Sequence, residues 1–176
     1  MSVQQALFGG AITLTLPGPF LDASTIRQVP DHQEVLLAHD SDVSAIVEVL
    51  QEAAKGVSPA DLGAAVRFHF GSIAHDNEAL SSEVIWDEPP ASSDACAPGA
   101  TPAPALLYGT QRIRKFGKAT EESTVNIFVA VWRLESKKID LVLSVNDPRA
   151  GAPDATADWF RSAAQSLQIR DWGLFA

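Results

Sequence analysis

The stretch 124–134 constrains the fold of this chain more than any other feature, because it is apolar on both faces of an extended strand. Successive side chains of a strand point to opposite sides of its sheet. One side would receive Val125, Ile127, Val129 and Val131, and the other Phe128, Ala130 and Trp132. Such a strand is buried on both sides, so it predicts a central strand in a sheet covered by helices on both faces.

Apolar periodicity predicts the elements around this strand. A repeat of two residues predicts strands at 11–16, 33–39, 80–86, 105–116 and 139–145. Helical spacing predicts helices at 42–54, 58–70 and 158–169. The first of these helices has the clearest pattern, with Ser41 or Asp42 as its cap and Gly56 at its end. Strands adjacent in sequence and clustered helices predict an α+β fold, an α/β/α sandwich with a central, mostly antiparallel sheet.

The length of 176 residues predicts a single domain over residues 1–176. The segment 89–104 holds five prolines and five alanines in sixteen positions. We expect a surface loop there, because proline lacks a backbone donor and interrupts helices and central strands. It is not expected to be a domain boundary, since neither side alone shows a complete set of elements. The longest apolar runs are far short of the ~20 residues that span a bilayer.

Acidic residues are concentrated in the first half of the chain. Residues 1–94 carry 3 Lys and Arg against 14 Asp and Glu, a net charge of −11, whereas residues 95–176 carry 10 against 8, a net charge of +2. An acidic half disfavours nucleic acid and anionic membranes as partners, because both are bound through Lys and Arg. It favours a basic protein partner, with the alternative that acidity only keeps the protein soluble.

The sequence lacks motifs for catalysis or cofactor binding. Gly9-Gly10 is not followed by the glycine, lysine and hydroxyl of a phosphate-binding loop. No pair of His or Cys has metal-site spacing, and Cys96 lies in the proline-rich segment without a fixed base. Surface or packing roles are expected for the four histidines, His32, His39, His69 and His75. We therefore expect no catalytic residue, cofactor or metal.

The N-terminal segment is dense in turn residues and charges, and it resembles the Ran guanine nucleotide release factor family, the Mog-type proteins of nuclear import. The matching pieces are Leu-Phe-Gly-Gly-Ala at 7–11, Asp-Ala-Ser at 22–24, Arg-Gln-Val-Pro-Asp at 27–31 and Gln-Glu-Val at 33–35. A weaker match covers 44–52. The resemblance implies an α/β/α sandwich similar to the photosystem protein PsbP, in agreement with the predicted element order.

This resemblance also implies a function. It implies that the chain binds the small GTPase Ran, promotes release of its guanine nucleotide and supports nuclear protein import. We therefore expect a monomeric regulator of a GTPase, not an enzyme, that acts in the nucleus and passes through the cytoplasm.

The resemblance further implies that the Ran-binding surface is acidic and lies on the N-terminal segment and the expected helix 42–54. The matching positions are Asp31 and Glu34 in the segment and Glu48 on the helix, with Asp22 as a further candidate.

The family usually has a second acid three residues after the position of Glu48. This chain has Gln51 there, followed by Glu52. On a helix Gln51 would share a face with Glu48, whereas Glu52 would be turned by ~100°. Because Gln51 is neutral, we expect weaker Ran binding, and with it weaker release activity, than in a chain with an acid at this position.

Two other functions stay open at this point. One is a docking module that binds Ran-GTP or another import factor without driving nucleotide release. The other is a small-ligand-binding or enzymatic domain on a PsbP-like scaffold, which a buried, polar-lined pocket would favour.

Overall fold

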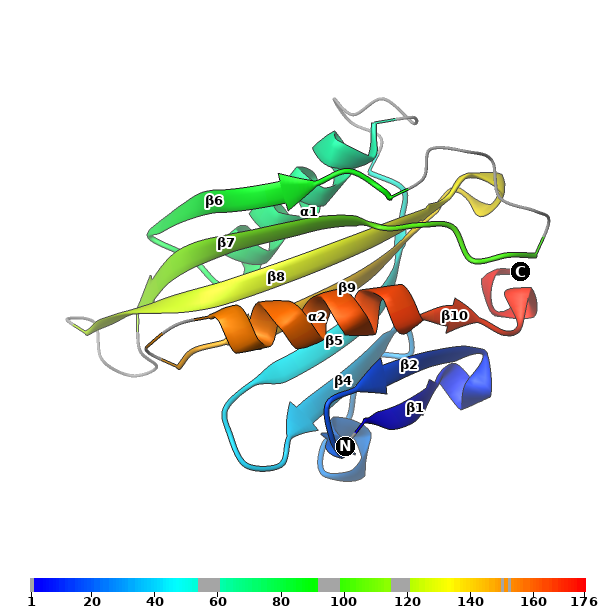
Figure 1. Cartoon of the computed structure of the whole chain (residues 1–176), viewed down its shortest axis with the longest axis horizontal. Helices are drawn as coiled ribbons and strands as arrows, with labels where there is room; N and C mark the ends of the chain where they lie inside the picture. The colour runs from blue at the N-terminus through cyan, green and yellow to red at the C-terminus, as the bar shows by residue number, and fades with distance from the viewer. Residues whose placement is uncertain (1, 54–60, 92–98, 115–120, 150, 152) are drawn as a thin grey trace.

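The computed structural model describes residues 2–53, 61–91, 99–114, 121–149, 151 and 153–176. A seven-stranded antiparallel sheet has the strand order β3-β4-β5-β9-β8-β7-β6, and a small sheet has the order β1-β2-β10 (Figure 1). The strands of the large sheet are β3 (Phe20–Asp22), β4 (Gln33–Ala38), β5 (Ser44–Gln51), β6 (Ser81–Glu88), β7 (Ala105–Arg114), β8 (Glu122–Leu134) and β9 (Ile139–Asp147). The small sheet comprises β1 (Val3–Leu7), β2 (Ile12–Leu16) and β10 (Gln168–Ile169).

Helices cover both faces of the large sheet, as the pattern at 124–134 predicts. Helix α1 (Leu62–Asp76) packs on β6, β7 and β8, and helix α2 (Asp154–Ser166) packs on the opposite face together with β2 (Figure 1). Alternate residues of β8 enter two separate cores. Val125, Ile127, Val129 and Val131 join Val66 and Phe70 of α1, whereas Phe128, Ala130 and Trp132 join Phe160 and Ala163 of α2.

The predicted helix at 42–54 is wrong, because residues 44–51 form strand β5. This strand pairs with β4 on one side and with β9 on the other. Ala45, Val47 and Val49 face the α2 core, so the segment alternates as well as showing helical spacing. Its β-branched residues fit a paired strand better than a helix. Ser41, expected as a helix cap, accepts a hydrogen bond from the amide of Val43 in the turn before β5.

The other predicted elements are present with shifted ends. Helix α1 starts after Asp61, whose carboxylate accepts from the amide of Ala64, and it continues five residues past Gly71. The residues 58–60, expected to start this helix, lie outside the described part of the chain, as do 92–98 of the proline-rich segment. Helix α2 starts earlier than predicted, at Asp154, and the chain is extended from Leu167 so that β10 can pair with β2. Strands β1 and β3 were not predicted.

Within the described residues, no helix is both long enough and apolar enough to cross a membrane.

Gly109 of β7 marks the closest approach between α1 and the sheet. A Cβ atom at this position would lie 2.6 Å from Cζ of Phe70 and 2.5 Å from the backbone oxygen of Glu83. Both neighbours are held in place, Phe70 by the core and Glu83 by strand pairing. Glycine at this position therefore allows α1 to pack closely on β7.

We expect Gly109→Ala to lower the free energy of unfolding by about 1–3 kcal/mol, because an added methyl group overpacks this contact. The matched control is Gly71→Ala in α1, where an added Cβ has no neighbour within 4 Å. That change should raise stability by up to ~1 kcal/mol, because alanine favours a helix interior. Urea unfolding of the three proteins measures both effects. Equal stability of Gly109→Ala and the wild type would contradict the tight contact.

Candidate protein-binding surface

Glu48 lies in the middle of β5, directly opposite Gln33 of β4. Its Oε2 accepts a hydrogen bond from Nε2 of Gln33 at 2.8 Å and lies 3.9 Å from Nε2 of His32. The Glu48 side chain is 21% exposed, and that of His32 is 52% exposed. The carboxylate therefore reaches the surface but is held in one orientation by its neighbour across the strands.

Asp31 joins Glu48 through the turn that precedes β4. The carbonyl of His32 accepts from the amide of Val49, which ties this turn to β5. Asp31 is exposed and is the residue next to His32. We call Asp31, His32, Gln33 and Glu48 the Glu48 cluster. Asp31 and Glu48, two of the acids expected at the binding surface, are thus linked through His32, which is next to Asp31 in sequence and 3.9 Å from Glu48.

Glu34 points to the opposite face of the sheet from Glu48, because it is next in sequence to Gln33, which pairs with Glu48. Its Oε1 accepts from the amide of Phe8 at 2.7 Å. Phe8 has φ of 51°, an uncommon value for a residue with a side chain, and Gly9 and Gly10 follow with φ of 69° and 95°. Glu34 therefore holds the sharp turn between β1 and β2.

This contact explains why the Leu-Phe-Gly-Gly and Gln-Glu-Val pieces occur in one chain, since they meet in space. The glycines allow the turn, and Glu34 satisfies the half-buried amide at its start. The resemblance implies that Glu34 belongs to the same surface as Asp31 and Glu48. Strand alternation instead directs the side chain of Glu34 to the opposite face of the sheet from Glu48.

Asp22 has a local role at the end of β3. Its Oδ1 accepts from the amide of Ser24 at 2.9 Å, and its carbonyl accepts from the hydroxyl of Thr25. These bonds cap the short turn Ala23–Thr25, which packs on β4.

Gln51 and Glu52 lie at the far end of β5. Gln51 is three residues from Glu48, so on a strand the two side chains leave opposite faces of the sheet. The expectation that Gln51 shares a face with Glu48 is therefore wrong, for the same reason that the helix is wrong. Glu52 follows the last residue of the strand, and its amide donates to the carbonyl of Lys138.

A buried ionic network near this end of β5 was missed by sequence reasoning. Asp140 of β9 pairs directly across the strands with Arg133 of β8, whose Nε donates to Oδ1 of Asp140 at 2.8 Å. Oδ2 of Asp140 accepts from the amide of Ala53 and lies 2.7 Å from Nε2 of His69 in α1. The network thus joins β8, β9, α1 and the residues that follow β5.

The environment of Asp140 keeps its carboxyl ionised. Burial by itself would raise its pKa, but hydrogen bonds from His69, Arg133 and the Ala53 amide, with the charge of Arg133, hold the pKa well below its ordinary value. The expected packing role of His69 is confirmed, since the ring is buried. A sequence signal existed: Arg133 and Asp140 interrupt two apolar strands at nearly equal distances from their connecting turn.

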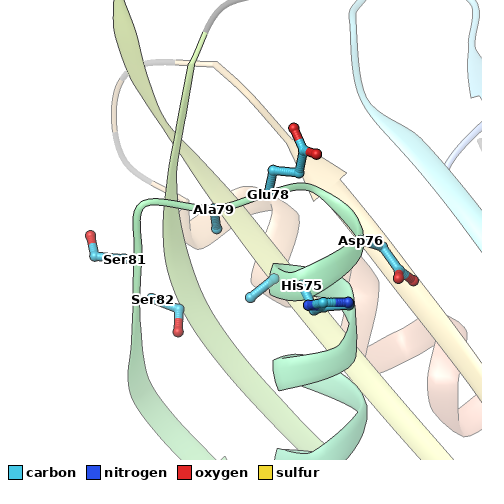
Figure 2. A pocket seen from close by; sticks show the side chains of 7 residues that line it. His75, Asp76, Glu78, Ala79, Ser81 and Ser82 are labelled. Atoms are coloured by element: carbon cyan, nitrogen blue, oxygen red, sulfur yellow. The ribbon is translucent and has the colours of Figure 1, made fainter.

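Open hollows lie on the described surface. One lies where α1 ends and β6 begins (Figure 2). His75, Asp76 and Glu78 line it with Ser81 and Ser82, and all five are exposed. Figure 2 shows that Ser81 and Asp76 point in different directions. Across the described residues, no three His, Cys, Asp or Glu side chains are grouped as metal ligands.

Comparisons with known proteins agree on one family. The family profile described as "Ran-interacting Mog1 protein" matches residues 5–148. The nuclear import protein mog1 of Schizosaccharomyces pombe is 40% identical over 147 residues, which cover 81% of this chain and 75% of that protein. The Ran guanine nucleotide release factor of Danio rerio is 32% identical, over 98% of this chain and 100% of that protein.

A solved structure has the same fold along the whole chain. The crystal structure of the Saccharomyces cerevisiae Ran-binding protein Mog1p superposes with a TM-score of 0.75 at 26% identity, covering 100% of this chain and 99% of that one. The α+β fold predicted from the sequence is confirmed by this match and by the sheet order.

We expect Glu34→Ala to be less stable than Glu34→Gln by ~1 kcal/mol. Alanine leaves the Phe8 amide without its acceptor, whereas glutamine keeps an oxygen there and loses only the charge. Urea unfolding of both variants measures the difference. If the two variants are equally stable, the bond to Phe8 does not hold the turn.

Asp140→Asn should lower the free energy of unfolding by about 3–5 kcal/mol at pH 7, because it removes the carboxylate charge that pairs with the buried guanidinium of Arg133. The lowered pKa of Asp140 stabilises the fold above the pKa of an unfolded aspartate, ~4, and this contribution is lost as the pH falls below it.

The difference in the free energy of unfolding between wild type and Asp140→Asn should therefore become smaller by about 1 kcal/mol as the pH falls from 5 to 3. Urea unfolding of both proteins across this pH range measures the difference. A difference that does not change with pH would contradict the claim that Asp140 is ionised in the folded protein.

Proposed function

Because this chain belongs to the Mog1 family of Ran-interacting proteins, we propose that it binds the small GTPase Ran and promotes release of its guanine nucleotide, in support of nuclear protein import. The observation that carries the proposal is the match to this family over residues 5–148. The import role is taken from the name of the fission yeast relative, and the release activity from the name of the zebrafish relative.

The Glu48 cluster is the part of the surface that we assign to Ran. Glu48 is held by Gln33 without being neutralised, and Asp31 is exposed beside it. Both acids belong to the half of the chain with a net charge of −11. Such a surface attracts a basic patch and repels an acidic one, which provides orientation and specificity.

Asp22 and Glu34 act indirectly in this proposal, because their carboxylates already bind backbone amides. Asp22 holds the turn after β3, and Glu34 holds the turn between β1 and β2 against β4, so both fix the backbone around the surface. Gln51 and Glu52, at the end of β5, are at its margin.

Nucleotide release follows from binding thermodynamics. Small GTPases hold their nucleotide through backbone amides, a lysine and Mg²⁺ around the phosphates. A partner that binds nucleotide-free Ran more tightly than loaded Ran must weaken nucleotide binding by the same factor. Carboxylates that pair with basic groups near the phosphates provide such a difference. No covalent bond changes, so Asp31 and Glu48 act by charge and not as acid or base.

The second candidate is a docking module that binds Ran-GTP without driving release. Gln51 favours it, because the resemblance to the family implies an acid at this position and this chain has a neutral side chain there. Ran binding without faster nucleotide release would support this candidate.

We place the protein in the nucleus with passage through the cytoplasm, on the names of its yeast relatives as nuclear import proteins. We propose that a monomer is the active form.

Glu48→Lys should weaken Ran binding at least tenfold, because it places a like charge opposite the basic patch of the partner. The matched control is Glu83→Lys, the same change at an exposed position on β6, at the far edge of the sheet. It should bind Ran like the wild type. Titration of purified Ran in its GDP, GTP and empty states gives the three affinities.

Salt provides a second readout. Raising the ionic strength to 0.15 M shortens the Debye length to ~8 Å and should slow wild-type association more than that of Glu48→Lys. Wild-type affinity of Glu48→Lys, or equal loss in Glu83→Lys, would contradict the assignment of this surface.

A further inference from the structure

The large sheet is wider than the helix that covers its α1 side. Helix α1 packs on β6, β7 and β8, and Figure 1 shows it behind these strands. In the described residues α1 packs mainly on β6, β7 and β8, and on the same face of β5 Leu50, near the end of the strand, packs against the α1 core. The other face of β4 and β5 is covered, because Leu36, Ala45 and Val47 belong to the core with α2.

Strand register identifies the side chains on the α1-side face of β4 and β5. Gln33, Val35 and Leu37 of β4 lie on one side of the strand, and Leu21 of β3 is opposite Leu37. Ile46 of β5 lies opposite Val35 on one side and Ser144 of β9 on the other.

These apolar side chains are accessible to different degrees. Leu21 is 45% exposed, Leu37 and Ile46 are half-buried, and Val35 is buried. Leu21 and Leu37 are direct cross-strand neighbours, so their side chains adjoin. An apolar strip of this kind, bordered by polar groups, is typical of an interaction surface.

Glu48 lies on the same face, two residues from Ile46 along β5, a separation of about 7 Å. It is opposite Gln33, two residues from Val35 in the same way. The strip therefore runs into the Glu48 cluster without a change of sheet face. We call the combined surface, formed by Leu21, Leu37, Ile46 and Glu48, the β3–β5 face.

We propose that the β3–β5 face is where Ran binds, with Leu21, Leu37 and Ile46 in direct apolar contact and Glu48 at the acidic rim. The proposal rests on the proposed function and adds a source of binding affinity that the acids alone do not provide. Exposed charge pairs contribute little to affinity, whereas desolvated apolar contacts at the centre of an interface contribute most. The partner patch should have apolar side chains beside Lys or Arg.

A second exposed apolar region lies at the opposite edge of the sheet and offers a comparison. Ile85 of β6 is 49% exposed, close to the value for Leu21. Both residues lie on edge strands of the same sheet. Ile85 is far from the Glu48 cluster in strand order, with β9, β8 and β7 between β5 and β6. The same substitution at the two sites therefore separates a specific contact from a general effect of surface charge.

The experiment compares Ran binding by wild type, Leu21→Asp and Ile85→Asp, using nucleotide-free Ran and isothermal titration. Leu21→Asp should weaken the affinity at least tenfold, and Ile85→Asp should leave it within twofold of wild type. Thermal unfolding of each variant checks that the fold is kept. Should Leu21→Asp unfold, Leu21→Ser takes its place.

A second measurement needs no variant at all. Amide hydrogen exchange of the wild type with and without Ran should show added protection in Phe20–Asp22 and Gln33–Ala38 and none in Ser81–Glu88.

The outcomes distinguish this inference from the proposed function. Wild-type binding that Leu21→Asp leaves unchanged would overturn the β3–β5 face and keep the proposed function. Equal loss in both aspartate variants, or protection confined to Ser81–Glu88, would also overturn the face. Failure of the wild type to bind Ran in any nucleotide state would overturn the proposed function itself.

Discussion

Two-sided burial of β8 is the constraint on which the rest of the structure depends. Its alternate residues fill one core with α1 and another with α2, so α1 lies over β6, β7 and β8 and α2 lies over β8 and β9 on the other face. β3, β4 and β5 then extend beyond α1. The exposed Leu21 and the carboxylate of Glu48 lie on the face of these strands that α1 reaches only at Leu50.

Much of the fold could be predicted because its strongest signals are local. The pattern at 124–134 identified a strand buried on both sides, and the polar turn after it gave the pairing of β8 with β9. The segment 44–51 was misjudged because its apolar residues fit both a helix and a strand. Only its position between β4 and β9, a long-range fact, decides between them. Short edge strands such as β3 carry too few residues for any period to show.

Acidic side chains have three different roles in this structure, which the sequence alone could not separate. Glu34 and Asp22 bind backbone amides, Asp140 neutralises a buried arginine, and Asp31 and Glu48 face solvent. The sorting depends on strand alternation: Gln33 and Glu34 are neighbours in sequence but leave opposite faces of the sheet. The predicted helix at 42–54 gave a different arrangement, because on a helix Glu48 and Gln51 would share one face.

The central claim is that this chain loosens the hold of Ran on its nucleotide. The most direct measurement is the rate at which Ran loaded with a fluorescent guanine nucleotide releases it, with unlabelled nucleotide in excess and increasing amounts of the purified chain. The account predicts a release rate that rises with the concentration of the chain and then saturates. A rate that stays at its spontaneous value, at concentrations where binding to Ran is saturated, would contradict it.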